Sequence, residues 1–273
     1  MSALARACHP LPTVAVTACA VALAVAAGNA VSTCVLLAAA AFAGQLTVGW
    51  SNDRLDWRAD RQVGRTEKPI AAGEISPRAV EIAILVAAVA CIGLSLALGW
   101  RAGATHLAAV ACAWAYNLWL KGTWLSWLPY ALAFAAVPTV ATLALPSHPA
   151  PPVWAVAVGA LIGIAANLTN ALPDLDRDQA TGFRGLPSRL GAHVSVILAL
   201  VLVVAMSAIV AFGPPGPPTA VGWTGLALTV AAVAATAPAL MRRAPTRVPF
   251  YALMALVPID VVVIVLTGIN RGD

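Results

Sequence analysis

Three aspartates and an asparagine follow an apolar stretch of the chain at spacings that suit divalent-cation chemistry. They form the pattern N-D-x-x-D-x-x-x-D, which runs from Asn52 through Asp53 and Asp56 to Asp60. Separations of three, four and seven residues place the acids on one face of a helix that continues from the apolar stretch. Like charges at these spacings repel one another, and carboxylate oxygens are the ligands that Mg²⁺ shares with substrate phosphates. The pattern therefore predicts a magnesium site.

A simpler interpretation of the same residues is a solvated helix at the membrane edge. Arg54, Arg58 and Arg61 are interleaved with the acids and would balance their charge. This interpretation accounts for the near-neutral charge of the segment. It does not account for the helical positions of the residues, because the acids share a stripe and the arginines lie mostly beside it. The register favours the metal site.

A second acidic pattern, "NALPDLDRD", begins at residue 170. Asp174 and Asp178 are one helical turn apart, and Asn170 lies one turn before them, so the three share a face. Asp176 points elsewhere and is expected to be exposed. The simpler interpretation is a charged loop in which Pro173 starts a new segment.

Basic residues follow each acidic motif, as a site for an anion requires. They are Arg65 and Lys68 after the first motif, and Arg184 and Arg189 after the second. Paired acids and cations suit Mg²⁺ together with an anion that carries more charge than a monophosphate, such as a diphosphate. The chain contains no G-x-x-x-x-G-K-[ST] pattern, so nucleotide hydrolysis is not predicted.

Membrane-spanning helices are the elements expected to hold these motifs. Of the 273 residues, 61% are hydrophobic and only 10% are charged. The apolar runs are continuous, which excludes a membrane β-barrel with its alternating strands. Runs of about 17 to 25 apolar residues occur near 13–29, 31–50, 79–99, 104–120, 124–145, 153–172, 193–213, 222–241 and 249–269. We predict one all-α polytopic domain over residues 1–273, with nine transmembrane helices around a central cavity and two Asp-rich loops.

The distribution of basic residues predicts the orientation of these helices. With nine spans, fourteen Lys and Arg residues fall on the side of the N-terminus and the two motif loops, against Arg101 and Arg271 on the other side. The positive-inside rule then places the N-terminus and both Asp-rich loops in the cytoplasm and the C-terminus outside. Arg outnumbers Lys fourteen to two, which suggests a GC-rich bacterial genome and hence a bacterial plasma membrane. The first span, preceded by Arg6, also has the pattern of a secretory signal, but we interpret it as a span.

Both motifs resemble those of the UbiA superfamily of intramembrane prenyltransferases. The similarity continues through "RTEKPIAAGEIS" after the first motif and "NALPDLDRDQATGFRGLPSRLG" at the second. The resemblance implies a prenyl diphosphate donor whose diphosphate is bridged by two Mg²⁺ ions. The implied metal ligands and catalytic acids are Asp53, Asp56, Asp174 and Asp178, with Asn52 and Asp60 completing the first cluster. The implied diphosphate-binding residues are Arg65, Lys68 and Arg184, with Asn170, Tyr116 and Lys121 as further candidates.

One stretch departs from the family pattern. Many relatives carry Y-x-x-x-K on the fourth helix, whereas Tyr116 and Lys121 are five residues apart here. In an α-helix Lys121 then lies on the same face as Asn117 rather than Tyr116. Lys121 could simply anchor the helix at the membrane interface. For Tyr116, Trp119, Trp124 and Trp127, we prefer the interpretation as an interfacial aromatic belt to that as a wall for a substrate cation.

Polar residues outside the motifs carry weaker signals. Asp260 lies within an apolar run, where a charge is costly, so we expect it to face the bundle as a hydrogen-bonded acid after Pro258. An alternative is that it serves as a base on the acceptor side. The histidines His106, His148 and His193 are expected at scattered helix ends, so no histidine metal site is predicted.

These observations predict a Mg²⁺-dependent membrane prenyltransferase. It would move an isoprenoid chain from its diphosphate to a small aromatic, lipid-accessible acceptor, in contact with membrane lipids. A terpene cyclase of the same fold, which needs no acceptor, is the first alternative. An ion-coupled transporter is the second, disfavoured because the acids lie in loops rather than at the bilayer midplane. The cations form no stripe interleaved with aromatics, so nucleic-acid binding is not expected, and nothing indicates an obligatory protein partner.

Overall fold

The computed structural model describes residues 2–175, 178 and 184–269, and within these residues all regular structure is helical, as predicted. The long helices are α2 (Pro10–Ala26), α3 (Val31–Gln62), α4 (Pro77–Ala97), α5 (Trp100–Ala115), α6 (Trp127–Leu143), α7 (Val153–Asn170), α10 (Ala192–Phe212), α11 (Ala220–Arg242) and α12 (Val248–Thr267). The short segments are α1 (Ala3–Ala7), the π-helical turn η1 (Tyr116–Leu120), the 3₁₀ turn η2 (Leu172–Asp174) and α9 (Leu186–Leu190).

Six of the described helices are long and apolar enough to cross a membrane, namely α3, α4, α7 with η2, α10, α11 and α12. Helices α2 and α6 are apolar but shorter, and α5 gains length by continuing into η1. Each predicted span overlaps one of the long helices. The number of nine membrane crossings stays a prediction.

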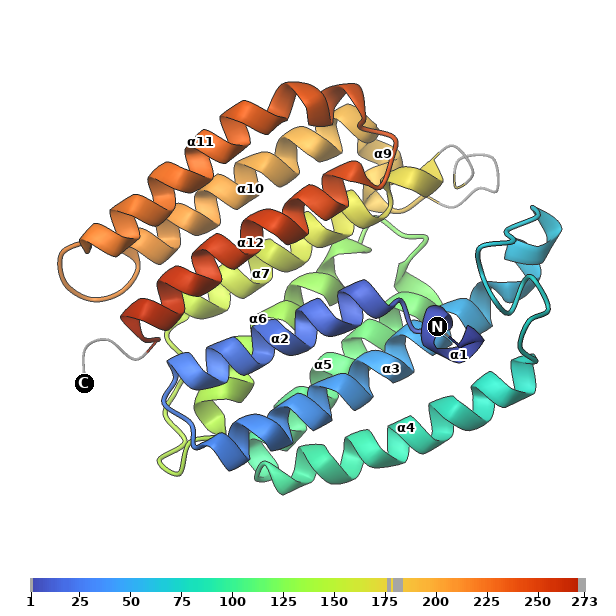
Figure 1. The fold of residues 1–273 in the computed structure, drawn as a ribbon, viewed down its shortest axis with the longest axis horizontal. Coiled ribbons are helices and arrows are strands. Elements are labelled where there is room, and N and C mark those ends of the chain that lie inside the picture. The colour runs from blue at the N-terminus through green and yellow to red at the C-terminus, as the bar shows by residue number, and fades with distance from the viewer. Residues whose placement is uncertain (1, 176–177, 179–183, 270–273) are drawn as a thin grey trace.

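The helices pack in an order that returns to its starting point. Along the chain, α2 packs on α3, α3 on α4, α5 on α6, α6 on α7, and α7 on α10. Helix α10 packs on α11 and α12, and α12 packs back on α2. Figure 1 shows the result, with α2 to α5 in one part of the bundle, α7 and α10 to α12 in the other, and α6 between them. A functional cavity can therefore form between helices that are distant in sequence.

Helices α6 and α7 approach closely because two glycines of α7 face the backbone of α6. A Cβ atom at Gly163 would lie 2.3 Å from the Tyr130 carbonyl oxygen, and one at Gly159 would lie 2.5 Å from that of Phe134. Small residues permit this kind of backbone contact between membrane helices. The close packing sets Tyr130 beside the end of α7, where Asn170 introduces the second motif.

Both motif regions lie at the same end of the bundle. Helix α3 continues past the apolar stretch to Gln62, so the first motif occupies its last turns, and the predicted continuous helix is confirmed. Figure 1 shows this end of α3 on the same side as α1 and α9, while the C-terminus lies at the opposite end. Which end faces the cytoplasm stays a prediction.

Candidate active site

The aspartates of the first motif divide between two environments on α3. Asp53 and Asp60 are buried, with 2% and 0% of their side chains exposed, whereas Asp56 retains 22%. At 3.6 residues per turn, Asp60 lies about 20° around the helix from Asp53, and Asp56 lies about 60° from it. The shared face that the spacing predicts is therefore wide enough for packing to separate Asp56 from the other two.

Lys68 lies between the two buried aspartates. Its Nζ is 3.0 Å from Asp53 Oδ1 and 2.9 Å from Asp60 Oδ2. Burial by itself would lower the pKa of Lys68, but the neighbouring carboxylates outweigh it and raise that pKa above its ordinary value. The lysine is thus held charged within the first motif, and its predicted contact with a diphosphate stays a prediction.

The arginines interleaved with the acids have other partners. Arg54 pairs with Glu81 of α4, with Nη2 and Oε1 2.5 Å apart, and the Arg58 guanidinium lies over the ring of Trp57. The cations that contact Asp53 and Asp60 come instead from the segment after α3. This agrees with the register argument, which placed the interleaved arginines beside the acid stripe.

A π-helical turn positions Lys121 against the first motif. The Lys121 N–H donates to the Tyr116 carbonyl oxygen at 3.0 Å, which is the i to i+5 bond of a π-helix. Lys121 Nζ lies 2.5 Å from Asp56 Oδ2, and Asn117 accepts a 3.3 Å hydrogen bond from Asn52 one turn earlier. Lys121 and Asn117 thus both contact α3, as expected for residues on one face. The backbone hydrogen bond that joins Lys121 to Tyr116 in the π turn was not predicted from the sequence.

The second motif meets the first through Arg65. The Arg65 guanidinium contacts Asp174 at the end of η2, and its Nη1 lies 3.6 Å from Asp60 Oδ1. Asp178 is half-buried and within electrostatic reach of Tyr116. The two acidic motifs, more than one hundred residues apart in sequence, therefore share one cation.

Some predicted site residues lie away from this contact. Arg184 is exposed, and its carbonyl oxygen accepts a 2.9 Å hydrogen bond from Arg189 Nε. Asp176 lies outside the described residues, so its expected exposure stays a prediction. Asn170 is also exposed, and its amide donates to the Tyr130 hydroxyl at 3.2 Å.

Aromatic side chains lead from the acidic cluster into the bundle. The rings of Tyr116 and Tyr130 meet edge to face with centroids 4.9 Å apart, and Tyr130 stacks on Phe134 at 6.4 Å. Tyr116 is buried, whereas Trp119 and Trp124 are 71% and 58% exposed, as a belt facing lipid would be. Tyr116 therefore differs from its neighbours. The sequence analysis missed Tyr130 and Phe134, because contacts between helices leave no signal in spacing along the chain.

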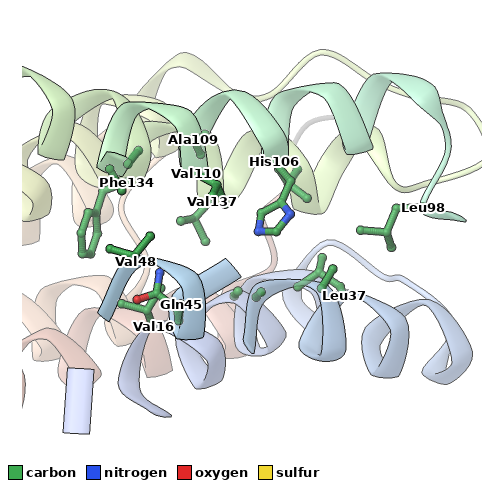
Figure 2. A pocket seen from close by; sticks show the side chains of 17 residues that line it. Val16, Leu37, Gln45, Val48, Leu98, His106, Ala109, Val110, Phe134 and Val137 are labelled. Atoms are coloured by element: carbon green, nitrogen blue, oxygen red, sulfur yellow. The ribbon is translucent and has the colours of Figure 1, made fainter. Parts of the chain in front are cut away.

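An apolar cavity of about 70 Å³ lies between α2, α3, α5 and α6. Phe134 lines it at the end of the aromatic series, and Val48, one turn before Asn52, lines it on α3. Figure 2 shows Gln45 and His106, the polar side chains among the seventeen lining residues, pointing into this space. His106 lies within α5 rather than at a helix end, so that expectation was wrong, and its Nδ1 is 2.7 Å from Ser95 Oγ.

Glu81 and Asp260 are two acids outside the motifs whose surroundings the structure defines. Glu81 is half exposed in its pair with Arg54. Asp260 is buried with 2% exposure and faces Ser207 of α10, so it points into the bundle as predicted. Among the described pairs, Glu81 reaches the first motif only through Arg54, and Asp260 contacts none of the motif acids.

The donor chemistry of the cluster fits Mg²⁺. In the described part of the chain, no three acidic, histidine or cysteine side chains converge as a finished metal site. The carboxylates contact Arg65, Lys68 and Lys121 instead. However, Asp56 and Asp174 keep 22% and 32% of their side chains exposed. These partly exposed oxygens could bind a hard divalent cation, and Lys121 and Arg65 could then pair with an incoming anion.

Comparison with protein families and curated proteins gives a consistent result. The model of the UbiA prenyltransferase family matches residues 12–256. A digeranylgeranylglyceryl phosphate synthase of Methanopyrus kandleri is 26% identical over 183 residues, 67% of this chain and 66% of that protein. The 33 kDa chain of bacteriochlorophyll synthase of Cereibacter sphaeroides is 31% identical over 194 residues, 63% of this chain and 62% of that protein. Both matches span less than two thirds of the relatives' length.

Solved structures share the arrangement of helices. The apo structure of a UbiA homolog from Aeropyrum pernix K1 aligns with a TM-score of 0.75 and 19% identity, covering 93% of this chain and 97% of that one. A UbiA homolog from Archaeoglobus fulgidus bound to GPP and Mg²⁺ aligns with a TM-score of 0.71 and 15% identity, covering 96% and 97%. At these identities the likeness concerns the fold.

Proposed function

Because the chain belongs to the UbiA prenyltransferase family, we propose that it transfers an isoprenoid chain from a prenyl diphosphate to a small acceptor and releases diphosphate. Family membership and six apolar helices make it an integral membrane enzyme of the prenyl-transferase class. We place the motif end in the cytoplasm of a bacterium, on the charge distribution described above.

The contact of Arg65 with both motifs carries this proposal. It draws Asp60 and Asp174 together at one end of the bundle, and the aromatic series connects that end with the apolar cavity. A prenyl diphosphate has the same division, with a highly charged head and a hydrocarbon tail. The charged cluster would bind the diphosphate head, and the apolar cavity would receive the hydrocarbon tail.

The cations of the cluster would stabilise the leaving group. Breaking the allylic C–O bond leaves its electron pair, and so negative charge, on the diphosphate, and fixed positive charges stabilise such developing charge. Arg65 and Lys121 are suited to this role because each contacts a carboxylate that is partly open to solvent, Asp174 and Asp56 respectively. Lys68 and Arg184 are the remaining candidates on the two segments that follow the motifs.

The interior of the bundle would protect the allylic cation. The cavity is lined mainly by apolar side chains, and excluding water prevents hydrolysis of a reactive cation. The faces of Tyr116, Tyr130 and Phe134 offer cation–π stabilisation along the way.

We assign Mg²⁺ as the cofactor, with two ions on the diphosphate. The residues that would hold it are Asn52, Asp53, Asp56, Asp60, Asp174 and Asp178. Bound Mg²⁺ neutralises the diphosphate and orients it for departure. The UbiA homolog of Archaeoglobus fulgidus has been solved with GPP and Mg²⁺, which supports the assignment for this chain.

A small aromatic acceptor suits the cavity better than a phosphate-bearing one. None of its seventeen lining residues is charged, and its polar groups are the amide of Gln45 and the imidazole of His106. A phosphate in this space would lack a cationic partner, which is costly for a buried charge. A neutral aromatic ring would meet apolar walls.

The test is an assay of the purified protein with Mg²⁺ and labelled prenyl diphosphates of several lengths. The expected result is diphosphate release and a prenylated product that both require a small aromatic acceptor. Hydrocarbon formed without any acceptor would establish the cyclase alternative instead. Absence of diphosphate release under every condition would overturn both enzyme interpretations.

A further inference from the structure

His9, at the start of α2, adopts a backbone conformation that non-glycine residues rarely take. Its φ and ψ are 55° and 68°, in the left-handed region, and Pro10 follows it directly. Such a conformation persists only where the surroundings impose it. His9 occupies the N-cap position, but its side chain makes no capping hydrogen bond. Helix capping therefore does not explain this residue.

The His9 side chain reaches Asp53 instead. Its Nε2 lies 3.1 Å from Asp53 Oδ1, and because an ionised carboxylate only accepts hydrogen bonds, Nε2 is the donor. Lys68 Nζ contacts the same oxygen at 3.0 Å. Among the described contacts of Asp53, none engages Oδ2. The two donors thus hold the same oxygen and fix the direction of the carboxylate.

The His9 segment packs closely on α3 and is hydrogen-bonded to the first turn of α2. Trp50 Nε1 of α3 donates to the Leu4 carbonyl oxygen at 2.9 Å, and Thr13 Oγ1 donates to that of Cys8 at 2.8 Å. A Cβ at Gly49 would lie 2.3 Å from the Cys8 oxygen, so only glycine permits this approach. Figure 1 shows α1 lying against this end of α3. The left-handed backbone of His9 therefore occurs within a closely packed segment.

We propose that His9 is a positioning residue that orients the Asp53 carboxylate for cation binding. The inference rests on the proposed function in naming Mg²⁺ as the cation. Groups that hydrogen-bond to a ligand carboxylate fix its direction, and removing them typically weakens metal affinity about 10- to 100-fold. His9 does this from a segment more than forty residues before the motif, with Lys68 as the second donor.

The experiment compares Mn²⁺ binding by the full-length protein and its variants, measured as loss of the free Mn²⁺ EPR signal without substrate. His9→Ala and His9→Phe should weaken binding about 10- to 100-fold, while His9→Asn, which keeps an N–H donor, should recover most of it. His148→Ala is the matched control, since His148 is the other non-glycine residue with positive φ in the described chain and lies in the turn between α6 and α7. Thermal unfolding of all variants separates positioning from loss of fold.

The outcomes distinguish this inference from the proposed function. If the wild-type protein releases diphosphate but His9→Ala and wild type bind Mn²⁺ equally, the positioning role is wrong and the enzyme assignment stands. If His9→Ala weakens Mn²⁺ binding but no prenyl diphosphate is turned over by the wild type, the positioning role stands and the proposed function fails. Equal weakening in His148→Ala would also overturn the positioning role.

Discussion

The two sides of the first acidic motif lie on one helix but in different surroundings. On one side, Asp53 and Asp60 are buried and share Lys68. On the other side, Asp56 is partly open and contacts Lys121, whose position depends on a π-helical turn. Asp174 of the second motif, held by Arg65, resembles Asp56 in exposure.

This difference indicates a division of labour. Ion pairs excluded from water are strong and costly to separate, so the pairs of Lys68 provide a rigid frame. Pairs in contact with water contribute little net stability, so Lys121 and Arg65 can exchange a carboxylate for a diphosphate at small cost. We call the first set the closed pairs and the second set the open pairs.

The largest expected effect comes from removing an acid of the open pairs. Asp56→Ala or Asp174→Ala should lower turnover at least about 10³-fold, the upper range for loss of one preorganised charge-stabilising group, while the protein stays folded. Diphosphate release and thermal unfolding measure the two quantities. Near-full activity in both variants would refute the metal assignment.

Replacing Lys68 or Lys121 by methionine tests the difference between closed and open pairs directly. Lys68→Met should lower the free energy of unfolding by about 3–5 kcal/mol, because it removes the cation that two buried carboxylates share. Lys121→Met should cost at most about 1 kcal/mol of stability but should reduce diphosphate turnover strongly. The unfolding free energy and the turnover of both variants are measured in the same detergent. Equal losses of stability in the two variants would remove the distinction between closed and open pairs.

The closed pairs should also affect how the stability of the protein depends on alkaline pH. The pKa of Lys68 is raised in the folded protein, so its contribution is fully present below the unfolded-state pKa of about 10.4 and is lost as the pH rises from there through the folded-state value. The stability difference between wild type and Lys68→Met should therefore be constant from pH 7 to about pH 10. A difference that already shrinks across this range would contradict the pairing.

The π turn allows the open pairs to be tested by changing chain length. Deleting the exposed Trp119 would restore a four-residue spacing between Tyr116 and the lysine, which keeps both on one side of an α-helix. Activity should therefore stay within about tenfold, whereas inserting one alanine after Trp119 should cost about 100-fold through misplacement of the lysine. Similar activity in the two variants would show that the register of Lys121 is unimportant.

The smallest effect is expected at a pair outside both sets. Glu81→Ala removes the partner of Arg54 at a half-exposed position, so it should change stability by less than about 1 kcal/mol and leave turnover unchanged. It serves as the control acid for Asp56 and Asp174. A large loss of activity would extend the site onto α4.

Several features of the site could be predicted because they depend on local periodicity. The motif acids occupy the helix that continues from the second apolar run, and Asp260 points into the bundle. Both follow from rules that act within one helix. The shared face of Lys121 and Asn117 was predicted, but the π turn from Tyr116 to Lys121 was not, because a π turn depends on how the helix end packs against its neighbours.

Other features required contacts between distant segments. Neither the donation from His9 to Asp53, nor the cation shared by Asp60 and Asp174, nor the series Tyr116, Tyr130 and Phe134 leaves a pattern in the sequence. The same applies to His106, which was expected at a helix end and lines the cavity. Such contacts depend on the packing of whole helices.

The sequence by itself determined that this is a helical membrane protein with two acidic motifs, because hydropathy and helical spacing are properties of consecutive residues. Only the tertiary structure decided which acids are closed and which are open. That outcome depends on which neighbouring segment excludes water from each carboxylate. Lys68 and the His9 segment do so for Asp53 and Asp60, while Asp56 and Asp174 keep contact with solvent.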